Sequence, residues 1–263
     1  MKKKLSVLSL LLGLLVSGFA LTACGSDDDD NNSGGTPQSS KRVVKVISEE
    51  GGEIDESTLS YDSQGRVVGI ETTYSSSNRD GYSKKTYQYG DITIITKEVE
   101  KKTYSSGQTS SHTETHSYTL ENGVIVKDVE TQSSVQTRTF TYDSNGYLTS
   151  ITDKSDNSTT VQKTSWTDGN LTKAEREYGD DRLWTYSNIP WMKGFPFYLK
   201  GLNMDEYLFA AGYYGKMPKN LPAQYNLKHL KYDYEMDGNL VTKVIINSES
   251  TNVQLATMTF VWE

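Results

Sequence analysis

The chain has 263 residues, with 27 Lys and Arg against 34 Asp and Glu, which gives a formal net charge of −7. This acidic balance argues against a nucleic-acid-binding protein, because such proteins ordinarily present a basic surface. The single cysteine excludes an internal disulfide framework and a multi-cysteine metal site, and 18 tyrosines with only 5 prolines favour β-structure.

The first 23 residues have the features of an export signal. Lys2–Lys4 form a basic start, an apolar run follows to Leu21, and small residues precede Cys24. The sequence Leu21-Thr22-Ala23-Cys24 resembles the lipobox of bacterial lipoproteins. The resemblance implies that Cys24 becomes the first residue of the mature chain and carries the acyl chains that anchor it to a membrane. The alternative is an ordinary secretory peptide followed by a chance cysteine.

Residues 24–40 contain nothing that could build a core, so we expect a flexible acidic tether. The run Asp27–Asp30 is not spaced as calcium ligands are. An acidic run directly after the lipidated cysteine resembles the surface-export signal of Bacteroidetes lipoproteins. We therefore expect the protein at the outer membrane, lipid-anchored and facing the cell exterior, in preference to retention in the periplasm.

The body of the chain repeats one turn pattern. The units Tyr61–Gly65 and Tyr142–Gly146 share the form Tyr-Asp-x-x-Gly, and looser copies end at Gly123, Gly169 and Gly238. Asp or Asn opens such a turn by accepting backbone hydrogen bonds, and Gly closes it with a positive φ. The glycines at 123, 146 and 169 are 23 residues apart, which indicates repeating hairpins.

Segments rich in Thr, Val, Ile and Tyr lie between these turns and are joined at their other ends by longer polar loops. This alternation predicts an all-β protein. We expect residues 41–263 to form one domain, an up-and-down antiparallel meander of about 12–15 strands curved into a barrel or trough.

The Tyr-Asp-x-x-Gly units resemble the YD repeats of bacterial β-shell proteins. Together, the lipobox, the acidic tether and the hairpins resemble a Bacteroidetes lipoprotein family whose domain is porin-like in fold and has no known function. The stretch Gly215–Pro222 is similar to a late segment of that family. The resemblance covers most of residues 41–263; it implies a fold and brings no catalytic residues.

The segment 187–226 departs from the hairpin pattern, being rich in proline and aromatic residues. We expect a short helix that Asn203 caps, with Glu206 returning the capping bond and Gly212 ending it. Strands 182–186 and 227–235 should run in the same direction, as a parallel pair joined by this crossover. Its apolar residues should then pack on the concave face: Phe195, Phe197, Leu199, Leu202, Leu208 and Phe209.

Few residues suggest chemistry. His112, Glu114 and His116 alternate and would share a strand face, where zinc could bind, but a solvated face is the preferred interpretation. We therefore predict no metal and no cofactor. Catalytic motifs are absent, so no catalytic residue is assigned. Carboxylate pairs that could serve as acid and base are Glu175 with Glu177 and Asp180 with Asp181, although acids on exposed strands more often keep a protein soluble.

Four aromatic residues in or beside the insertion are candidates for ligand binding, namely Trp184, Trp191, Tyr213 and Tyr214. Alternatively, they pack against the sheet. The sequence thus favours a non-enzymatic surface module, binding or structural, whose partner is a glycan or an envelope protein. The alternative is a glycan-processing or other hydrolytic enzyme. A barrel embedded in the membrane is disfavoured, because the strands carry too much Ser, Thr, Lys and Glu for a lipid-facing band.

Overall fold

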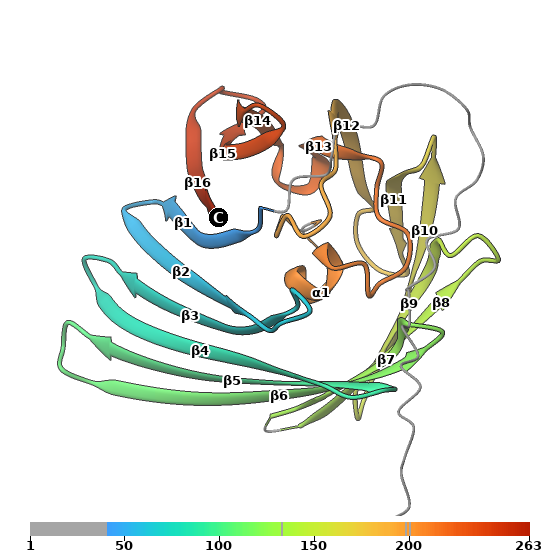
Figure 1. The fold of residues 1–263 in the computed structure, drawn as a ribbon, viewed down its shortest axis with the longest axis horizontal. Helices are drawn as coiled ribbons and strands as arrows, with labels where there is room; N and C mark the ends of the chain where they lie inside the picture. Colours follow the sequence, from blue (N-terminus) through green and yellow to red (C-terminus); the bar gives the residue numbers. More distant parts are fainter. Residues whose placement is uncertain (1–40, 133, 198, 200) are drawn as a thin grey trace, which may run out of the picture. The chain divides into compact units, whose positions relative to one another are not determined.

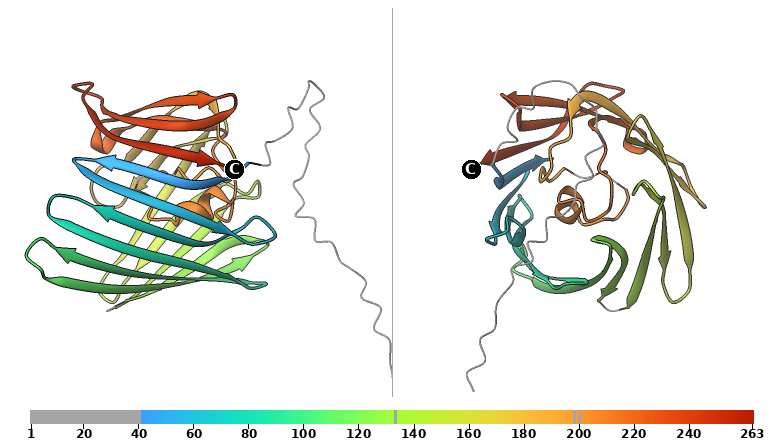
Figure 2. Two further views of the ribbon diagram at one scale, coloured as in Figure 1. Left: turned by 60° about the vertical axis from the view of Figure 1, so that its left-hand side comes forward. Right: turned by 45° about the vertical axis from the view of Figure 1, so that its right-hand side comes forward.

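The computed structural model describes residues 41–132, 134–197, 199 and 201–263. The leader, the tether and Cys24 lie outside these residues. The described residues form a β-barrel around a short helix (Figures 1 and 2). The elements are Val43–Glu50 (β1), Glu53–Tyr61 (β2), Val67–Ser75 (β3), Arg79–Tyr89 (β4), Thr93–Tyr104 (β5), Thr109–Glu121 (β6), Val124–Thr131 (β7), Val135–Tyr142 (β8), Leu148–Lys154 (β9), Thr159–Thr167 (β10), Asn170–Arg176 (β11), Arg182–Pro190 (β12), Glu206–Ala210 (α1), Asn220–Tyr225 (β13), the 3-10 turn Asn226–Lys228 (η1), Leu230–Asp237 (β14), Leu240–Ser248 (β15) and Gln254–Trp262 (β16).

Each strand pairs antiparallel with its neighbours in the chain, and β1 pairs with β16 to close the barrel, Val46 opposite Phe260. The predicted antiparallel meander is therefore confirmed. The described residues contain sixteen strands where the sequence predicted about 12–15, and β13 lies within the expected insertion. Among the described residues, we find no helix with the length and apolar character needed to span a bilayer.

The tight turns have the expected chemistry. The Asp62 carboxylate accepts from the backbone N–H groups of Gln64 and Arg66, both at 2.9 Å, and Asp143 accepts in the same way from Asn145 and Tyr147. Gly65 and Gly146 close these turns at φ +78° and +81°. We call the end of the barrel that carries these turns the turn rim, and the opposite end the loop rim.

Aromatic side chains on strands that lead toward the turn rim also have a structural role. On seven strands, a Tyr hydroxyl or Trp indole donates to a backbone carbonyl in the first residues of the preceding strand. Such hydrogen bonds link neighbouring strands near the turn rim. They are Tyr61 to Val43, Tyr89 to Val67, Tyr142 to Ile125, Trp166 to Leu148, Tyr186 to Leu171, Tyr234 to Pro222 and Trp262 to Val241.

The path of the insertion is partly as expected. Strands β12 and β14 run in the same direction, because both pair antiparallel with β13. They are not a parallel pair, however, since β13 lies between them. The crossing is made by the described residues between 191 and 219, which we call the inner segment, and Figure 2 shows them inside the barrel.

The inner segment supplies much of the core. Phe195, Leu199, Leu202 and Leu208 are at most 1% exposed and belong to one cluster with inward side chains of the strands. Phe195, for example, lies 4.7 Å from the ring of Phe260 on β16. The expectation that the insertion packs on the concave face is therefore confirmed. Burial of this many apolar side chains provides the main stabilisation of the barrel interior.

Helix α1 begins differently from the prediction. Its N-cap is Asp205, whose carboxylate accepts from the backbone N–H groups of Tyr207 and Leu208, whereas Asn203 lies two residues earlier at φ +51°. Gly212, at φ +88°, follows the end of the helix as expected. The cap differs because Asp205 is also held by the barrel wall, which the sequence around the helix does not reveal.

The inner segment also closes the turn rim. The N–H of Lys216 donates to the carbonyl of Gly146, and that of Lys219 to the carbonyl of Gly169, both at 2.9 Å. Gly215 fits closely here: a Cβ at this position would lie 2.5 Å from the Gly146 carbonyl oxygen. The stretch 215–219 therefore runs along consecutive tight turns, and the opposite half of the barrel interior is left to polar side chains.

Candidate functional site

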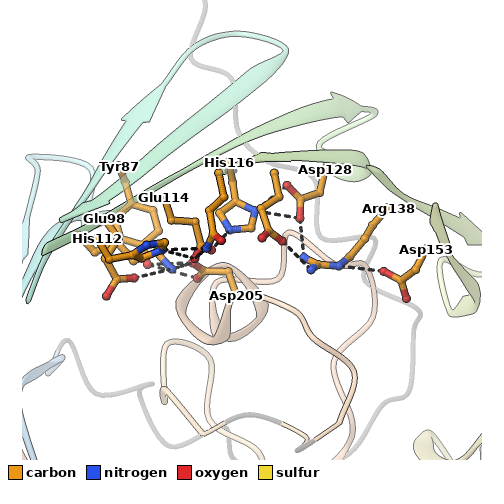
Figure 3. Close-up of polar contacts among 12 residues, drawn as sticks. Tyr87, Glu98, His112, Glu114, His116, Asp128, Arg138, Asp153 and Asp205 are labelled. Atoms are coloured by element: carbon orange, nitrogen blue, oxygen red, sulfur yellow. Dashed lines mark hydrogen bonds and ion pairs between the residues drawn. The ribbon is translucent and has the colours of Figure 1, made fainter. Parts of the chain in front are cut away.

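The candidate site is the polar half of the barrel interior, between the inner segment and the loop rim. Its wall is formed by strands β2 to β12, whose side chains alternate between the interior and the exterior. Figure 3 shows the charged side chains in a row beside α1. The members of this charged row, with opposite charges in contact, are Lys85, Glu98, Glu114, His116, Asp128, Glu130, Arg138, Asp153 and Asp205.

Asp205 joins the inner segment to the wall. Its Oδ2 atom lies 2.8 Å from Nζ of Lys85 and accepts a hydrogen bond of 3.0 Å from the Tyr87 hydroxyl. The Asp205 side chain is 1% exposed. Burial raises the pKa of its carboxyl, but Lys85 and the hydrogen bonds outweigh this effect and hold the pKa below its usual range. Asp205 is therefore a carboxylate that serves the fold.

A cavity of about 390 Å³ opens beside this pair. Lys85, Glu98, Asn203 and Glu206 are among the residues that line it. Burial and the neighbouring Asp205 raise the pKa of the Glu206 carboxyl to about 7. The cavity thus holds a group that exchanges a proton near neutral pH, next to a carboxylate that stays ionised.

His116 forms the middle of the charged row. Its Nδ1 atom lies 2.9 Å from Oδ1 of Asp128, its Nε2 atom contacts the carboxylate of Glu114, and its ring stacks on Tyr118. Burial opposes the charged imidazole, but the two carboxylates prevail and raise the pKa of His116. With a carboxylate at each ring nitrogen, the imidazolium form suits this position, because it donates from both nitrogens.

Arg138 ends the row with an unusual number of partners. Its guanidinium contacts Asp128 at 3.0 Å, Glu130 at 2.9 Å and Asp153 at 2.9 Å. The planar fork of an arginine can satisfy several carboxylates at once. Arg138 therefore neutralises the acids of strands β7 and β9 and fixes how they are placed in the interior.

A second cavity, of about 230 Å³, lies beyond Arg138. Asn203 of the inner segment lines both cavities, so both border this segment. The second cavity is lined by basic side chains, among them Lys154, Arg176 and Arg182, whereas the first contains Glu98 and Glu206. The open half of the barrel thus offers two neighbouring hollows of different charge.

The zinc ligands considered from the sequence come together only in part. Glu114, His116 and Glu130 have ligand atoms within 4.8 Å of one another, whereas His112 is exposed and contacts Gln132 at 2.8 Å. Metal ligation needs a neutral imidazole with a free nitrogen, and both nitrogens of His116 already face carboxylates. The arrangement fits a salt-bridge network better than a zinc site.

The four aromatic candidates lie in packing contacts. Trp184 is 4% exposed and stacks on Tyr225, and Tyr214 is 2% exposed with its ring edge against Phe140. Trp191 packs against Phe209, and Tyr213 against Tyr89. These contacts accord with the alternative in which the aromatic residues pack against the sheet.

The carboxylate pairs considered for hydrolysis lie on the exterior. Glu175, Glu177 and Asp180 are exposed, and Lys173 forms ion pairs with Glu175 and Asp181. Sequence reasoning missed Lys85, Asp128, Arg138 and Asp205, which come from different strands and from the inner segment. A partial signal existed, because strand β6 alternates between hydroxyl side chains and the side chains of His112, Glu114 and His116.

Comparisons with known proteins describe the fold and leave the ligand open. The family described as a domain of unknown function (DUF4595) with porin-like fold matches residues 59–237. A porin-like protein from Bacteroides vulgatus, solved as a crystal structure, is similar with a TM-score of 0.45 and 11% identity, covering 85% of this chain and 99% of that one. The comparison with curated proteins gives no match.

Proposed function

Since the chain belongs to the DUF4595 family of porin-like domains, we propose that it is a non-enzymatic binding module of the cell envelope, with its ligand in the open polar half of the barrel. The observation that carries the proposal is the division of the interior. The inner segment fills the turn-rim half with apolar side chains, while two cavities with charged linings remain in the loop-rim half. A concave site with convergent polar groups is the usual form of a ligand site.

The expected lipid on Cys24 would hold this module at the outer membrane, facing the cell exterior. The outer face of the barrel supports attachment through a lipid in preference to insertion into the bilayer. Exposed side chains of strands β4, β5, β6 and β8 include Lys84, Lys97, Ser117, Thr139 and Thr141. A barrel within the membrane needs an apolar band at this place.

The binding proposal is tested with an array of glycans and envelope proteins. Bulky substitutions in the two cavities, Thr72→Trp and Thr160→Trp, should each obstruct one hollow, and Ser117→Trp on the outer face is the matched control. We expect a ligand that binds the natural chain and the control but not at least one of the cavity variants. Unchanged binding in both cavity variants, with their folds intact by circular dichroism, would overturn the proposal.

The anchor and the orientation have their own tests. Changing Cys24 to Ala should abolish labelling with a radioactive fatty acid and release the protein from membranes. External protease should remove the natural protein from intact cells. Protection of the protein until the cells are lysed would instead place it on the periplasmic side.

A hydrolytic enzyme is the second candidate, and Glu206 is the observation in its favour. Its raised pKa and the lowered pKa of Asp205 resemble the divergence seen in acid–base carboxylate pairs. Against this, Asp205 is occupied by Lys85, Tyr87 and the helix N–H groups. Glycan cleavage that is lost in Glu206→Gln would establish the enzyme; binding without cleavage in the natural chain supports the module.

A further inference from the structure

Arg182, on strand β12, is a buried cation for which the described residues provide no carboxylate partner. The residue is only 9% exposed, and its Nε atom has no hydrogen-bond partner within the part of the chain that the structure describes. Its one hydrogen bond among the described residues is a long one, 3.4 Å from Nη1 to the Oε1 atom of Gln162. A buried charge is unfavourable unless it is paired, and Arg138 nearby shows the usual solution with three carboxylates.

The surroundings of Arg182 add further positive charge. Arg182 lines the 230 Å³ cavity together with Lys154 and Arg176, and no carboxylate within the described residues forms an ion pair with any of the three. The acid of this cavity, Asp153, is already bound by Arg138. Burial lowers the pKa of the Arg182 guanidinium, Tyr225 and Asp153 oppose this effect, and Arg176 adds to it. In a chain of net charge −7, one hollow is thus lined by three cations that form no ion pair among the described residues, namely Arg182, which is buried, and Lys154 and Arg176, which are exposed.

The inner segment holds the guanidinium in place. Gly201 has φ +101°, and a Cβ at this position would lie 2.7 Å from Nε and 2.8 Å from Cζ of Arg182. Glycine therefore lets the chain pass directly against the arginine. Arg182 is thus confined between Gly201 and Gln162 and is ordered before any ligand arrives, which reduces the entropy lost on binding.

The remaining lining is suited to hydroxyl groups. Ser155, Ser158 and Thr160 contribute hydroxyls, and Gln162 contributes an amide. Guanidinium forks bind carboxylates through paired hydrogen bonds, and neutral hydroxyl and amide side chains can bond to sugar hydroxyls. At about 230 Å³ the cavity is smaller than a typical site for a drug-sized molecule, so it suits a single small unit.

From this geometry we propose that the Arg182 cavity binds the carboxylate of a small hydroxylated ligand, as in a uronic acid residue of an acidic glycan. The inference rests on the proposed function and names the ligand class of one of its two cavities. The carboxylate would take the place opposite Arg182 with Lys154 and Arg176 beside it. The sugar hydroxyls would face Ser155, Ser158 and Thr160.

Calorimetric titration of the full chain tests this with three probes: D-glucuronate, inorganic phosphate and D-glucose. The variants are Arg182→Met, which removes the buried charge at similar volume, and Lys163→Gln as the control. Lys163 is an exposed cation on β10 next to Gln162, and successive residues of a strand point to opposite faces. We expect glucuronate to bind the natural chain and Lys163→Gln equally, and Arg182→Met about 10-fold or more weakly.

The melting temperature of the Arg182→Met variant shows whether Arg182 serves ligand binding or the stability of the fold. If Arg182 serves the ligand, Arg182→Met without ligand should have an unchanged or higher melting temperature, because an unpaired buried charge has been removed. A lower melting temperature together with unchanged glucuronate binding would overturn the inference. Glucose binding as tightly as glucuronate, phosphate binding without glucuronate, or no binding of glucuronate would also overturn it. The proposed function would then still depend on the glycan array and the two Trp variants.

Discussion

Nζ of Lys85 on β4 lies 2.8 Å from the carboxylate of Asp205, and this ion pair joins the barrel wall to the N-terminus of α1. One carboxylate therefore serves three purposes: it neutralises a lysine, accepts the Tyr87 hydroxyl and caps the helix. The contact fixes the boundary in space between the inner segment and the open polar half of the barrel interior.

The first prediction concerns this contact. Asp205→Ala should lower the free energy of unfolding by about 3–5 kcal/mol, because it leaves Lys85 without its partner and removes the helix cap. Glu71→Ala is the control, since Glu71 pairs with Lys84 at 2.6 Å on the exposed face of the same strands and should cost only about 0–1 kcal/mol. Urea unfolding measures both. Equal losses in the two variants would show that Asp205 does not fasten the segment.

The second prediction concerns His116 and pH. Its pKa is raised above 6.5 in the folded protein, so its contribution to stability is complete below about pH 6.5 and is lost as the pH rises through the folded-state pKa. The stability difference between the natural chain and His116→Gln should therefore be larger at pH 5.5 than at pH 8.5. Urea unfolding at several pH values gives this difference. A difference that grows with pH would mean that the imidazole is neutral.

The third prediction concerns Glu206. Its pKa is raised from 4.5 to about 7 in the folded protein, so ionisation weakens the fold as the pH rises through about 7. Glu206→Gln keeps the neutral shape and should be more stable than the natural chain at pH 8.5, by about 1–2 kcal/mol. At pH 4.5 the two should be nearly equal. Thermal unfolding of both proteins at pH 4.5 and pH 8.5 measures this difference. Equal stability of the natural chain and Glu206→Gln at pH 8.5 would contradict the prediction.

The fourth prediction concerns the hydrogen bonds from aromatic side chains to backbone carbonyls near the turn rim. Tyr142→Phe removes the hydroxyl that donates to the Ile125 carbonyl at 2.6 Å and should cost about 0.5–1.5 kcal/mol. Tyr178, 71% exposed, provides the matched control as Tyr178→Phe, with no expected loss. Chemical unfolding of both variants checks the difference. Should the two variants match, the hydroxyl bond adds nothing to the stability that the ring provides.

The sequence predicts the hairpins well because their signals are local. Asp62 and Gly65, or Asp143 and Gly146, determine a turn through bonds within a few residues. Strand β13 was missed because Pro222 argues against a strand. The strand tolerates Pro222, because a proline lacks the backbone N–H but keeps its carbonyl, which accepts a hydrogen bond from the Tyr234 hydroxyl.

The charged interior was harder to predict, because its strands are polar on both faces. Alternation within β6 places Glu114 and His116 together, but it cannot tell the interior from solvent when the outer residues are Ser and Thr. The partners Asp128 and Arg138 depend on strand register, and Asp205 depends on the path of the inner segment. The prediction of Asn203 as the helix cap was wrong for the same reason, because the path of the inner segment brings Asp205 to Lys85 on the barrel wall.

The pairing of β1 with β16 has a consequence for how the protein is made. The barrel can close only when residues 254–262 reach residues 43–50, so its last pairing is between the two most distant strands. Until then β1 is an unpaired edge with Val43 and Val46 uncovered, which is a template for aggregation during synthesis. Contacts of such long sequence separation form slowly. We therefore expect a chain that stops before β16 to be lost to aggregation or proteolysis, although most of its hairpins are complete.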